Sequence, residues 1–331
     1  MTHTALDQLK TLTTVVADSS DLEAIRKFRP LDATTNPSLI TAAAEQPESK
    51  ELIEDAYYQA KEEGYKNDEL IERTIDILTV KFGVEILKLI EGRVSTEVDA
   101  ALSYDTEATI QKAHELCELY KGYGIDQSRI LIKIASTWEG IQAAKVLEAE
   151  GIACNLTLLF GLHQAQACAD AKVTLISPFV GRILDWYKKA EGVDSYPIEK
   201  EKIQVWVSVK KIYTYYKQQN IPTQVMGASF RSIDQVLGLA GCDLLTISPS
   251  LLTQLEQDTR TVDAALDANK AKQAEAIVRP AQDEQSFKDE LNHDLMAFQL
   301  LQGGVDGFIK ARDQLSLLLR QSFGIDAEIK S

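Results

Sequence analysis

Short apolar runs alternate with longer amphipathic segments along most of the chain. The runs are rich in β-branched residues and are bounded by polar residues or glycine, which is typical of buried strands. The segments between them repeat their apolar residues at helical spacing. This pattern predicts eight strands, at residues 13–17, 31–36, 92–99, 130–135, 154–160, 173–179, 223–228 and 244–247.

Helices are expected between these strands. Two or three of them fill residues 39–91, with breaks near Gly64 and Gly83, and a longer helical segment spans 184–219. Beyond the last strand, residues 251–323 are polar and helical in pattern. The remaining helices are predicted at 5–12, 22–28, 108–120, 140–150, 163–171 and 232–240.

Eight strands that alternate with helices favour a parallel sheet, and eight is the number of strands that closes a (β/α)8 TIM barrel. A doubly wound open sheet is the main alternative. Against it, no Gly-x-Gly-x-x-Gly follows the first strand, and Gly122-Tyr-Gly124 comes after a helix, where a turn is expected. We expect a single α/β domain over residues 1–331, with the helical region 251–323 packed on the barrel or on a partner subunit.

A single lysine, Lys133, interrupts a strongly apolar strand, Ile130-Leu-Ile-Lys-Ile-Ala135. Alternation along the strand puts the three isoleucines on one face and Lys133 on the other. If both faces are buried, loss of hydration favours the neutral amine, which is the nucleophilic form. A lysine on an edge strand, or one that reaches the surface with its charged end, is the alternative.

In nearly all of the remaining strands, polar side chains interrupt the apolar run near the carboxyl end. Each one alone is explained by a helix cap or a turn, but their joint occurrence around a lysine indicates an active site, because barrel enzymes use the C-terminal ends of several strands. Glu97 is the least easily explained as structural, since it lies between two valines in a central strand. The other members of this set are Asp18, Thr34, Asn36, Ser95, Asn155, Thr157, Ser177, Ser229 and Arg231.

These residue types fit one reaction. A neutral lysine amine attacks a ketone, and loss of water gives an iminium that serves as an electron sink for breaking a neighbouring carbon–carbon bond. One carboxylate can transfer protons during iminium formation, and the other can take the proton from the hydroxyl of the departing aldehyde. Arg182 and Arg231 follow two of the strands and are either a phosphate clamp or surface arginines.

The composition of the chain argues against several classes of binding partner. The 331 residues carry a net charge of -15, with a pI near 4.8, so nucleic acid and anionic membranes are not expected partners. The four cysteines form no Cys-x-x-Cys pair and the four histidines no His-Glu-x-x-His, so a metal site is not expected either. No signal peptide and no apolar run near the roughly 20 residues of a membrane span are seen, which predicts a soluble, cytoplasmic protein.

The motifs around these polar residues closely resemble those of the class I transaldolases of the longer bacterial and eukaryotic type. They occur in the same order over most of the predicted barrel. The motifs are Asp32-Ala-Thr-Thr-Asn-Pro-Ser38, Val94-Ser-Thr-Glu-Val-Asp99, Ile130-Leu-Ile-Lys-Ile-Ala-Ser-Thr-Trp-Glu-Gly140, Cys154-Asn-Leu-Thr-Leu-Leu-Phe160, Ile176-Ser-Pro-Phe-Val-Gly-Arg182 and Gly227-Ala-Ser-Phe-Arg231.

The resemblance implies a (β/α)8 barrel that transfers a dihydroxyacetone unit through a Schiff base on Lys133. It implies sugar-phosphate substrates of the pentose phosphate pathway, no metal or organic cofactor, and a homodimer. Asp18 is implied as the acid/base for carbon–carbon cleavage. Glu97 is implied to act through a water that Thr157 helps to hold.

The same resemblance implies a set of substrate-binding residues. Those for the dihydroxyacetone part are Asn36, Asn155 and Ser177, and those for the hydroxyl and phosphate end are Thr34, Ser229, Arg182 and Arg231. Phe179 also matches the transaldolase pattern, whereas shorter aldolase-like relatives place a hydroxylated aromatic residue there. Two alternatives remain: a class I aldolase that releases free dihydroxyacetone, and a catalytically inert barrel that serves as a binding or structural protein.

Overall fold

The structure is a computed structural model that describes residues 3–196, 198–278 and 283–325, and for 198–205 the backbone alone. Within these residues, eight parallel strands pair in sequence order and β1 pairs with β8, so the sheet is a closed barrel. The (β/α)8 barrel is confirmed, and the open doubly wound sheet is wrong. The strands are β1 (Thr14–Asp18), β2 (Asp32–Thr34), β3 (Val94–Glu97), β4 (Ile130–Ala135), β5 (Cys154–Leu159), β6 (Leu175–Pro178), β7 (Gln224–Gly227) and β8 (Leu244–Ile247).

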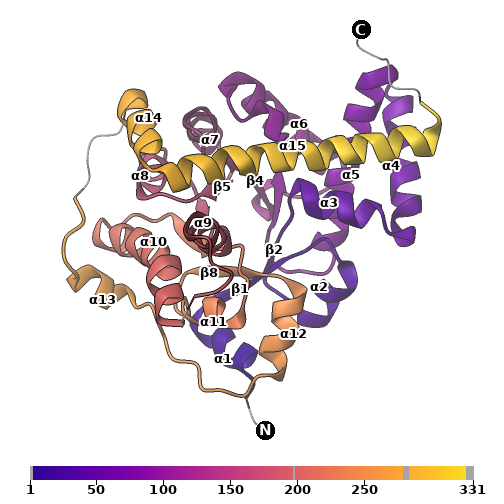
Figure 1. The fold of residues 1–331 in the computed structure, drawn as a ribbon. Coiled ribbons are helices and arrows are strands. Elements are labelled where there is room, and N and C mark those ends of the chain that lie inside the picture. Colours follow the sequence, from indigo (N-terminus) through magenta and orange to yellow (C-terminus); the bar gives the residue numbers. More distant parts are fainter. Residues whose placement is uncertain (1–2, 197, 279–282, 326–331) are drawn as a thin grey trace.

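Helices surround the barrel (Figure 1), and side-chain caps begin several of them. Asp21, Asn36, Asp105 and Thr137 each accept a hydrogen bond from a backbone N–H of the following first turn. The helices up to β6 are α1 (Ala5–Leu12), α2 (Leu22–Phe28), α3 (Pro37–Ala44), α4 (Lys50–Glu62), α5 (Asn67–Leu87), α6 (Thr106–Gly122), α7 (Trp138–Ala149) and α8 (Leu162–Asp170), with short 3₁₀ turns η1 (Pro47–Ser49), η2 (Ala100–Leu102) and η3 (Gln127–Arg129).

The helices after β6 are α9 (Gly181–Glu191), α10 (Ile198–Gln218), α11 (Ile233–Leu237), α12 (Pro249–Gln257), α13 (Ala268–Gln273), α14 (Glu284–His293) and α15 (Leu295–Phe323). The predicted helical segment 184–219 is therefore two helices, and α9 ends at Gly192, whose left-handed backbone (φ +67°) caps it. Within the described residues, no helix is both long and apolar enough to cross a membrane.

The predicted helix break near Gly83 is wrong, whereas the one near Gly64 is found. Gly64 lies between α4 and α5, but Gly83 lies inside α5. A side chain at Gly83 would overlap the ring of Tyr120, whose hydroxyl bonds to Thr96 of β3. The glycine therefore serves close packing of α5 against α6 and not a break in the helix.

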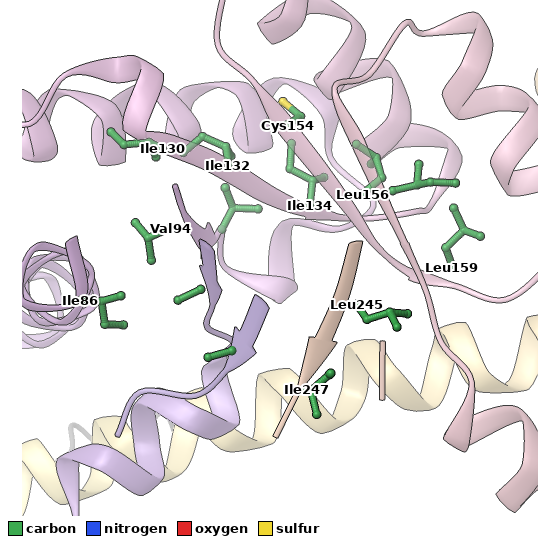
Figure 2. Close-up of a cluster of buried hydrophobic side chains, with 14 of the residues drawn as sticks. Ile86, Val94, Ile130, Ile132, Ile134, Cys154, Leu156, Leu159, Leu245 and Ile247 are labelled. Atoms are coloured by element: carbon green, nitrogen blue, oxygen red, sulfur yellow. The ribbon is translucent and has the colours of Figure 1, made fainter. Parts of the chain in front are cut away.

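The two faces of the barrel strands pack into two different apolar clusters. Ile130, Ile132 and Ile134 point outward into the main core between strands and helices (Figure 2), as the alternation predicted. Leu131 belongs instead to a small inner cluster with Val16, Leu175, Met226 and Leu244. This cluster fills the barrel interior below the level of Lys133, so the interior is packed there and polar above.

At the N-terminal end of the barrel, an arginine links residues from two strands. Arg93 donates to the carboxylate of Asp32 (3.0 Å) and to the side-chain carbonyl of Gln224 (3.0 Å). Asp32 and Gln224 begin β2 and β7, which β1 and β8 separate around the barrel. Asp32 opens the Asp32–Ser38 motif, yet its contacts place it at the end opposite to Lys133, where it stabilises the fold.

Strand β5 departs from regular alternation. The register with β6 shifts between Leu156 and Leu159, and Leu158 takes a left-handed backbone conformation (φ +53°). Regular alternation along the predicted strand 154–160 would place Leu158 on the same face as Cys154 and Leu156, and this expectation is wrong. Leu158 lies instead in a separate apolar cluster with Phe179 and residues of α15.

The long helix α15 runs across the barrel from α14 towards α4 and α5 (Figure 1). It contacts α3, α5, α9, η2 and β5. Thr41 of α3 donates to the carbonyl oxygen of Ala311 (2.8 Å), and Arg312 forms ion pairs with Asp99 (3.0 Å) and Asp76 (3.4 Å). These contacts hold α15 close to the carboxyl ends of the strands.

Candidate active site

Lys133 lies in the interior of the barrel, beside a carboxylate. Its side chain is only 6% exposed, and its Nζ atom is 3.1 Å from Oε2 of Glu97. Nζ also donates to the carbonyl oxygen of Thr35 (3.0 Å). The strand register makes Glu97 and Lys133 direct neighbours on β3 and β4. The alternative of an edge-strand or surface lysine is therefore wrong, because a closed barrel has no edge and this amine is buried.

Two carboxyl groups share this interior, and burial raises the pKa of both. For Asp18, burial outweighs the opposing effects of Lys133 and of a hydrogen bond from Thr34 (2.9 Å). For Glu97, burial outweighs the attraction of Lys133, and the nearby Asp18 raises its pKa further. A carboxyl group with a raised pKa can both donate and accept a proton near neutral pH.

A buried amide network lies beside the lysine. Asn155 is the neighbour of Lys133 on β5, and it donates to Ser95 Oγ (3.0 Å). Ser177 of β6 donates to Asn155 Oδ1 (2.6 Å). Both hydrogen-bonding ends of the amide are thus fixed by neighbouring strands, which sets its orientation beside the amine.

A cavity of about 180 Å³ opens above this layer. Glu97 and Asn155 do not line it; Glu97 borders a smaller cavity on its other side, next to Arg312. Asn36 lines the cavity and also caps α3. The predicted residues that line it are Asp18, Thr34, Asn36, Lys133, Thr157, Ser177, Phe179, Arg182, Ser229 and Arg231.

Several lining residues were missed by sequence reasoning: Ala228, Phe230, Thr246, Ser248 and Phe308. Thr246 is a polar residue within the apolar strand β8, so the criterion used for the other strands could have found it. Its hydroxyl lies 2.7 Å from that of Thr34. Phe308 gave no such signal, because an apolar residue on an amphipathic helix predicts only packing.

Thr157 has a buried hydroxyl whose Oγ1 has no hydrogen-bond partner among the described residues. Its carbonyl oxygen is held by the N–H (2.8 Å) and the hydroxyl (2.7 Å) of Ser136. The fully buried Gln164 donates to the carbonyl oxygens of Ser136 (2.9 Å) and Leu158 (3.1 Å). The irregular end of β5 is therefore tied to β4, and this aims an unpaired hydroxyl at the cavity.

The two arginines at the cavity differ in their partners. Arg231 donates through Nε (3.0 Å) and Nη2 (2.8 Å) to Asp185, and through Nη1 to Ser229 Oγ (3.2 Å). Arg182 has no carboxylate within ion-pair distance among the described residues. Its guanidinium lies 5.0 Å from the ring centre of Phe179 and 5.5 Å from that of Phe308. Burial, and then the nearby Arg231, lower the pKa of Arg182.

The loops after β6 and β7 hold these arginines close together. Ser229 has a left-handed backbone (φ +62°), and its carbonyl oxygen accepts a hydrogen bond from the N–H of Gly181 (2.7 Å). A Cβ atom at Gly181 would overlap that carbonyl oxygen. Glycine is therefore required at 181 for the two loops to approach.

The fold and this site define a (β/α)8 barrel with a buried lysine, two buried carboxyl groups and two arginines around one cavity at the carboxyl ends of its strands. Comparison with known proteins agrees. The family model described as Transaldolase/Fructose-6-phosphate aldolase matches residues 15–319. The chain belongs to the transaldolase/fructose-6-phosphate aldolase family.

Curated relatives cover almost the whole chain. The transaldolase of Trichormus variabilis is 54% identical over 324 residues, which are 97% of this chain and 97% of that protein. The transaldolase of Methylococcus capsulatus is 53% identical over 323 residues, 96% of this chain and 97% of that protein. The transaldolase of Thermosynechococcus vestitus is 54% identical over 319 residues, 96% of this chain and 81% of that protein.

Proposed function

We propose that this protein is a transaldolase. It transfers a dihydroxyacetone unit from sedoheptulose 7-phosphate or fructose 6-phosphate to glyceraldehyde 3-phosphate or erythrose 4-phosphate, in the non-oxidative pentose phosphate pathway. The observation that carries this proposal is the position of Lys133, 3.1 Å from Glu97 in an interior that also contains Asp18. The high identity to curated transaldolases supports the same activity.

The first half of the reaction forms the Schiff base. The neutral amine of Lys133 attacks the ketone carbon, and Glu97 supplies the proton with which the carbinolamine hydroxyl leaves as water. The unpaired hydroxyl of Thr157 is suited to hold a water between substrate and carboxylate. Asn36, Asn155 and Ser177 bind the hydroxyl groups of the dihydroxyacetone part.

The second half breaks and remakes a carbon–carbon bond. Asp18 takes the proton of the C4 hydroxyl, the C3–C4 electron pair moves into the iminium to give an enamine, and the aldehyde departs. The enamine then attacks the aldehyde carbon of the acceptor, Asp18 returns its proton, and hydrolysis frees Lys133. Thr34 bonds to Asp18 (2.9 Å) and can orient it. Ser229, Arg182 and Arg231 bind the hydroxyl and phosphate end.

A second candidate, an aldolase that releases free dihydroxyacetone, is less well supported. Phe179 lines the cavity without a hydroxyl and packs edge-on against Phe160, with ring centres 5.5 Å apart. It can therefore not donate a hydrogen bond to a water at the lysine. Cleavage of fructose 6-phosphate is measured with and without erythrose 4-phosphate, and a transferase needs the acceptor for turnover. Equal turnover without the acceptor would make the protein an aldolase.

The decisive test of the mechanism is covalent trapping. The protein is incubated with fructose 6-phosphate and borohydride, and the adduct is located by mass spectrometry. We expect reduction to fix one adduct on Lys133 and no adduct on Lys133→Ala. Labelling of other lysines at the same rate, or an unlabelled Lys133, would favour an inert barrel.

We also propose that the enzyme is a cytoplasmic homodimer and that residues 251–323 fold with the barrel as one domain. The acidic composition and the resemblance to transaldolases support the first part, and the contacts of α15 with the barrel support the second. Light scattering at micromolar concentration and calorimetry test these points. A monomeric mass, or two separate unfolding transitions, would contradict them.

A further inference from the structure

The two arginines at the cavity are held by different chemistry, and one of them depends on the C-terminal helix. Arg231 is paired with a carboxylate, whereas Arg182 lies near two aromatic rings. One ring, Phe179, directly follows β6, and Arg182 is the second residue of the next helix, α9. The other, Phe308, belongs to α15, is 3% exposed and lines the cavity.

An arginine held by rings keeps more of its charge for a ligand than one held by a carboxylate. The faces of aromatic rings attract a guanidinium without neutralising it, and its N–H edges stay free to bind oxygen atoms. A phosphate that accepts from these N–H groups gains charge-assisted hydrogen bonds. Arg182 is thus the cavity cation with the stronger net field, and its position depends on Phe308.

A close approach of α15 places Phe308 there. A Cβ atom at Gly304 would lie 2.6 Å from Leu158 Cδ2 and 3.2 Å from Arg182 Nη1. The same atom at Gly303 or Gly307 of the same helix would meet nothing within 4 Å. Only one of these three glycines is therefore required by packing, and it is the one that faces Arg182.

We propose that α15 forms part of the phosphate-binding end of the site, with Phe308 and Gly304 as positioning residues for Arg182. The inference rests on the proposed function, in which Arg182 binds the substrate phosphate. Phe308 and Phe179 both lie against the guanidinium, and Gly304 gives Nη1 the room to take that position. The substrate class selected is a phosphorylated aldose or ketose.

The first experiment compares substrates with and without phosphate. In Phe308→Leu, we expect the KM for glyceraldehyde 3-phosphate and the inhibition constant of inorganic phosphate to rise about tenfold, by the size of one desolvated cation–π contact. The KM for unphosphorylated glyceraldehyde, and borohydride trapping with free dihydroxyacetone, should stay near wild type. Phe308→Tyr keeps the ring and should restore the KM. Phe298→Leu, on an exposed part of α15, is the matched control.

The second experiment does not alter the core ring. Gly304→Ala should raise the same two constants, because Leu158 or α15 must move and Nη1 is crowded. Gly303→Ala adds the same methyl group in open space and should leave both constants unchanged. Equal effects at positions 303 and 304, or an equal loss with phosphorylated and unphosphorylated acceptors, would overturn the inference.

Arg182→Ala separates this inference from the proposed function. If Arg182→Ala loses the preference for phosphorylated acceptors while Phe308→Leu and Gly304→Ala keep it, the role of α15 is wrong and the phosphate role of Arg182 stands. If Arg182→Ala also keeps the preference, the phosphate role fails and the inference falls with it. Trapping on Lys133 reports in each variant whether the Schiff-base mechanism itself is intact.

Discussion

The Nζ atom of Lys133 lies 3.1 Å from Oε2 of Glu97, on the neighbouring strand of the barrel. Both side chains are buried, so the pair is shielded from bulk solvent. Burial nevertheless raises the pKa of Glu97 and so favours its protonated form more than in water. A proton near this pair can be handed to a leaving hydroxyl without a large cost in free energy.

Glu97→Gln should therefore slow iminium formation more than it weakens substrate binding. We expect the rate of borohydride-trapped adduct formation with fructose 6-phosphate to fall about 10²- to 10⁴-fold, the usual contribution of a general acid. The adduct should still form on Lys133 at long times, which single-turnover trapping followed by mass spectrometry measures. A trapping rate close to that of the wild type would remove Glu97 from this step.

Asp18→Asn should separate Schiff-base formation from cleavage. The amine of Lys133 is unaltered, so trapping with fructose 6-phosphate should persist. Release of glyceraldehyde 3-phosphate should fall about 10²- to 10⁴-fold, because no group takes the C4 hydroxyl proton. A coupled assay for the released aldehyde measures this. Loss of trapping together with cleavage would place Asp18 at the earlier step instead.

The same substitution should change stability in a pH-dependent way. Burial raises the pKa of Asp18 from its usual 3.8, so folding favours the protonated carboxyl group. Its contribution to stability is fully present below pH 3.8 and is lost as pH rises through the raised pKa. Asp18→Asn has no such loss. The free energy of unfolding of this variant, relative to that of the wild type, should therefore be higher at pH 8 than at pH 4. Urea unfolding at both pH values tests this, and a constant difference would contradict it.

Arg231→Ala should raise the KM for phosphorylated acceptors about tenfold while changing that for unphosphorylated acceptors much less, because a charge-assisted hydrogen bond to phosphate is lost. Arg231→Lys should restore little, since a single ammonium cannot bond to Asp185 and Ser229 in the fork geometry seen here. Steady-state kinetics with glyceraldehyde 3-phosphate and glyceraldehyde make the comparison. The same change in KM for both acceptors would mean that Arg231 is structural.

His163 should act as an acid-sensitive point of the fold outside the active site. Burial lowers the pKa of His163 from 6.5 to about 4, and Nε2 has no hydrogen-bond partner among the described residues. A lowered folded-state pKa means that stability is present above pH 6.5 and is lost as pH falls towards 4. The loss is about 3 kcal/mol by linkage.

His163→Gln keeps a polar side chain of similar size but does not titrate. The free energy of unfolding of this variant, relative to that of the wild type, should therefore increase as pH falls from 7 to 4. Urea unfolding across this range measures the difference, in which the carboxyl groups common to both proteins cancel. A difference that does not vary with pH would show that His163 does not control acid stability.

The local predictions from sequence succeeded where the chemistry is local. Strand β4, its outward isoleucines and its inward lysine follow from alternation. The predicted break at Gly83 failed because glycine was read as a helix breaker. Glycine is needed at position 83 because a side chain there would overlap the ring of Tyr120, a residue of another helix.

The sequence alone determined the order of strands and helices, the closed barrel they favour, and the polar positions that surround Lys133. Periodicity and residue type carry this information because each acts over a few neighbouring residues. Only the tertiary structure decided the irregular end of β5 at Leu158, the pairing of Arg231 with Asp185, and the place of Phe308 beside Arg182. These depend on how far one element is shifted against another, and packing between elements distant in sequence sets that shift.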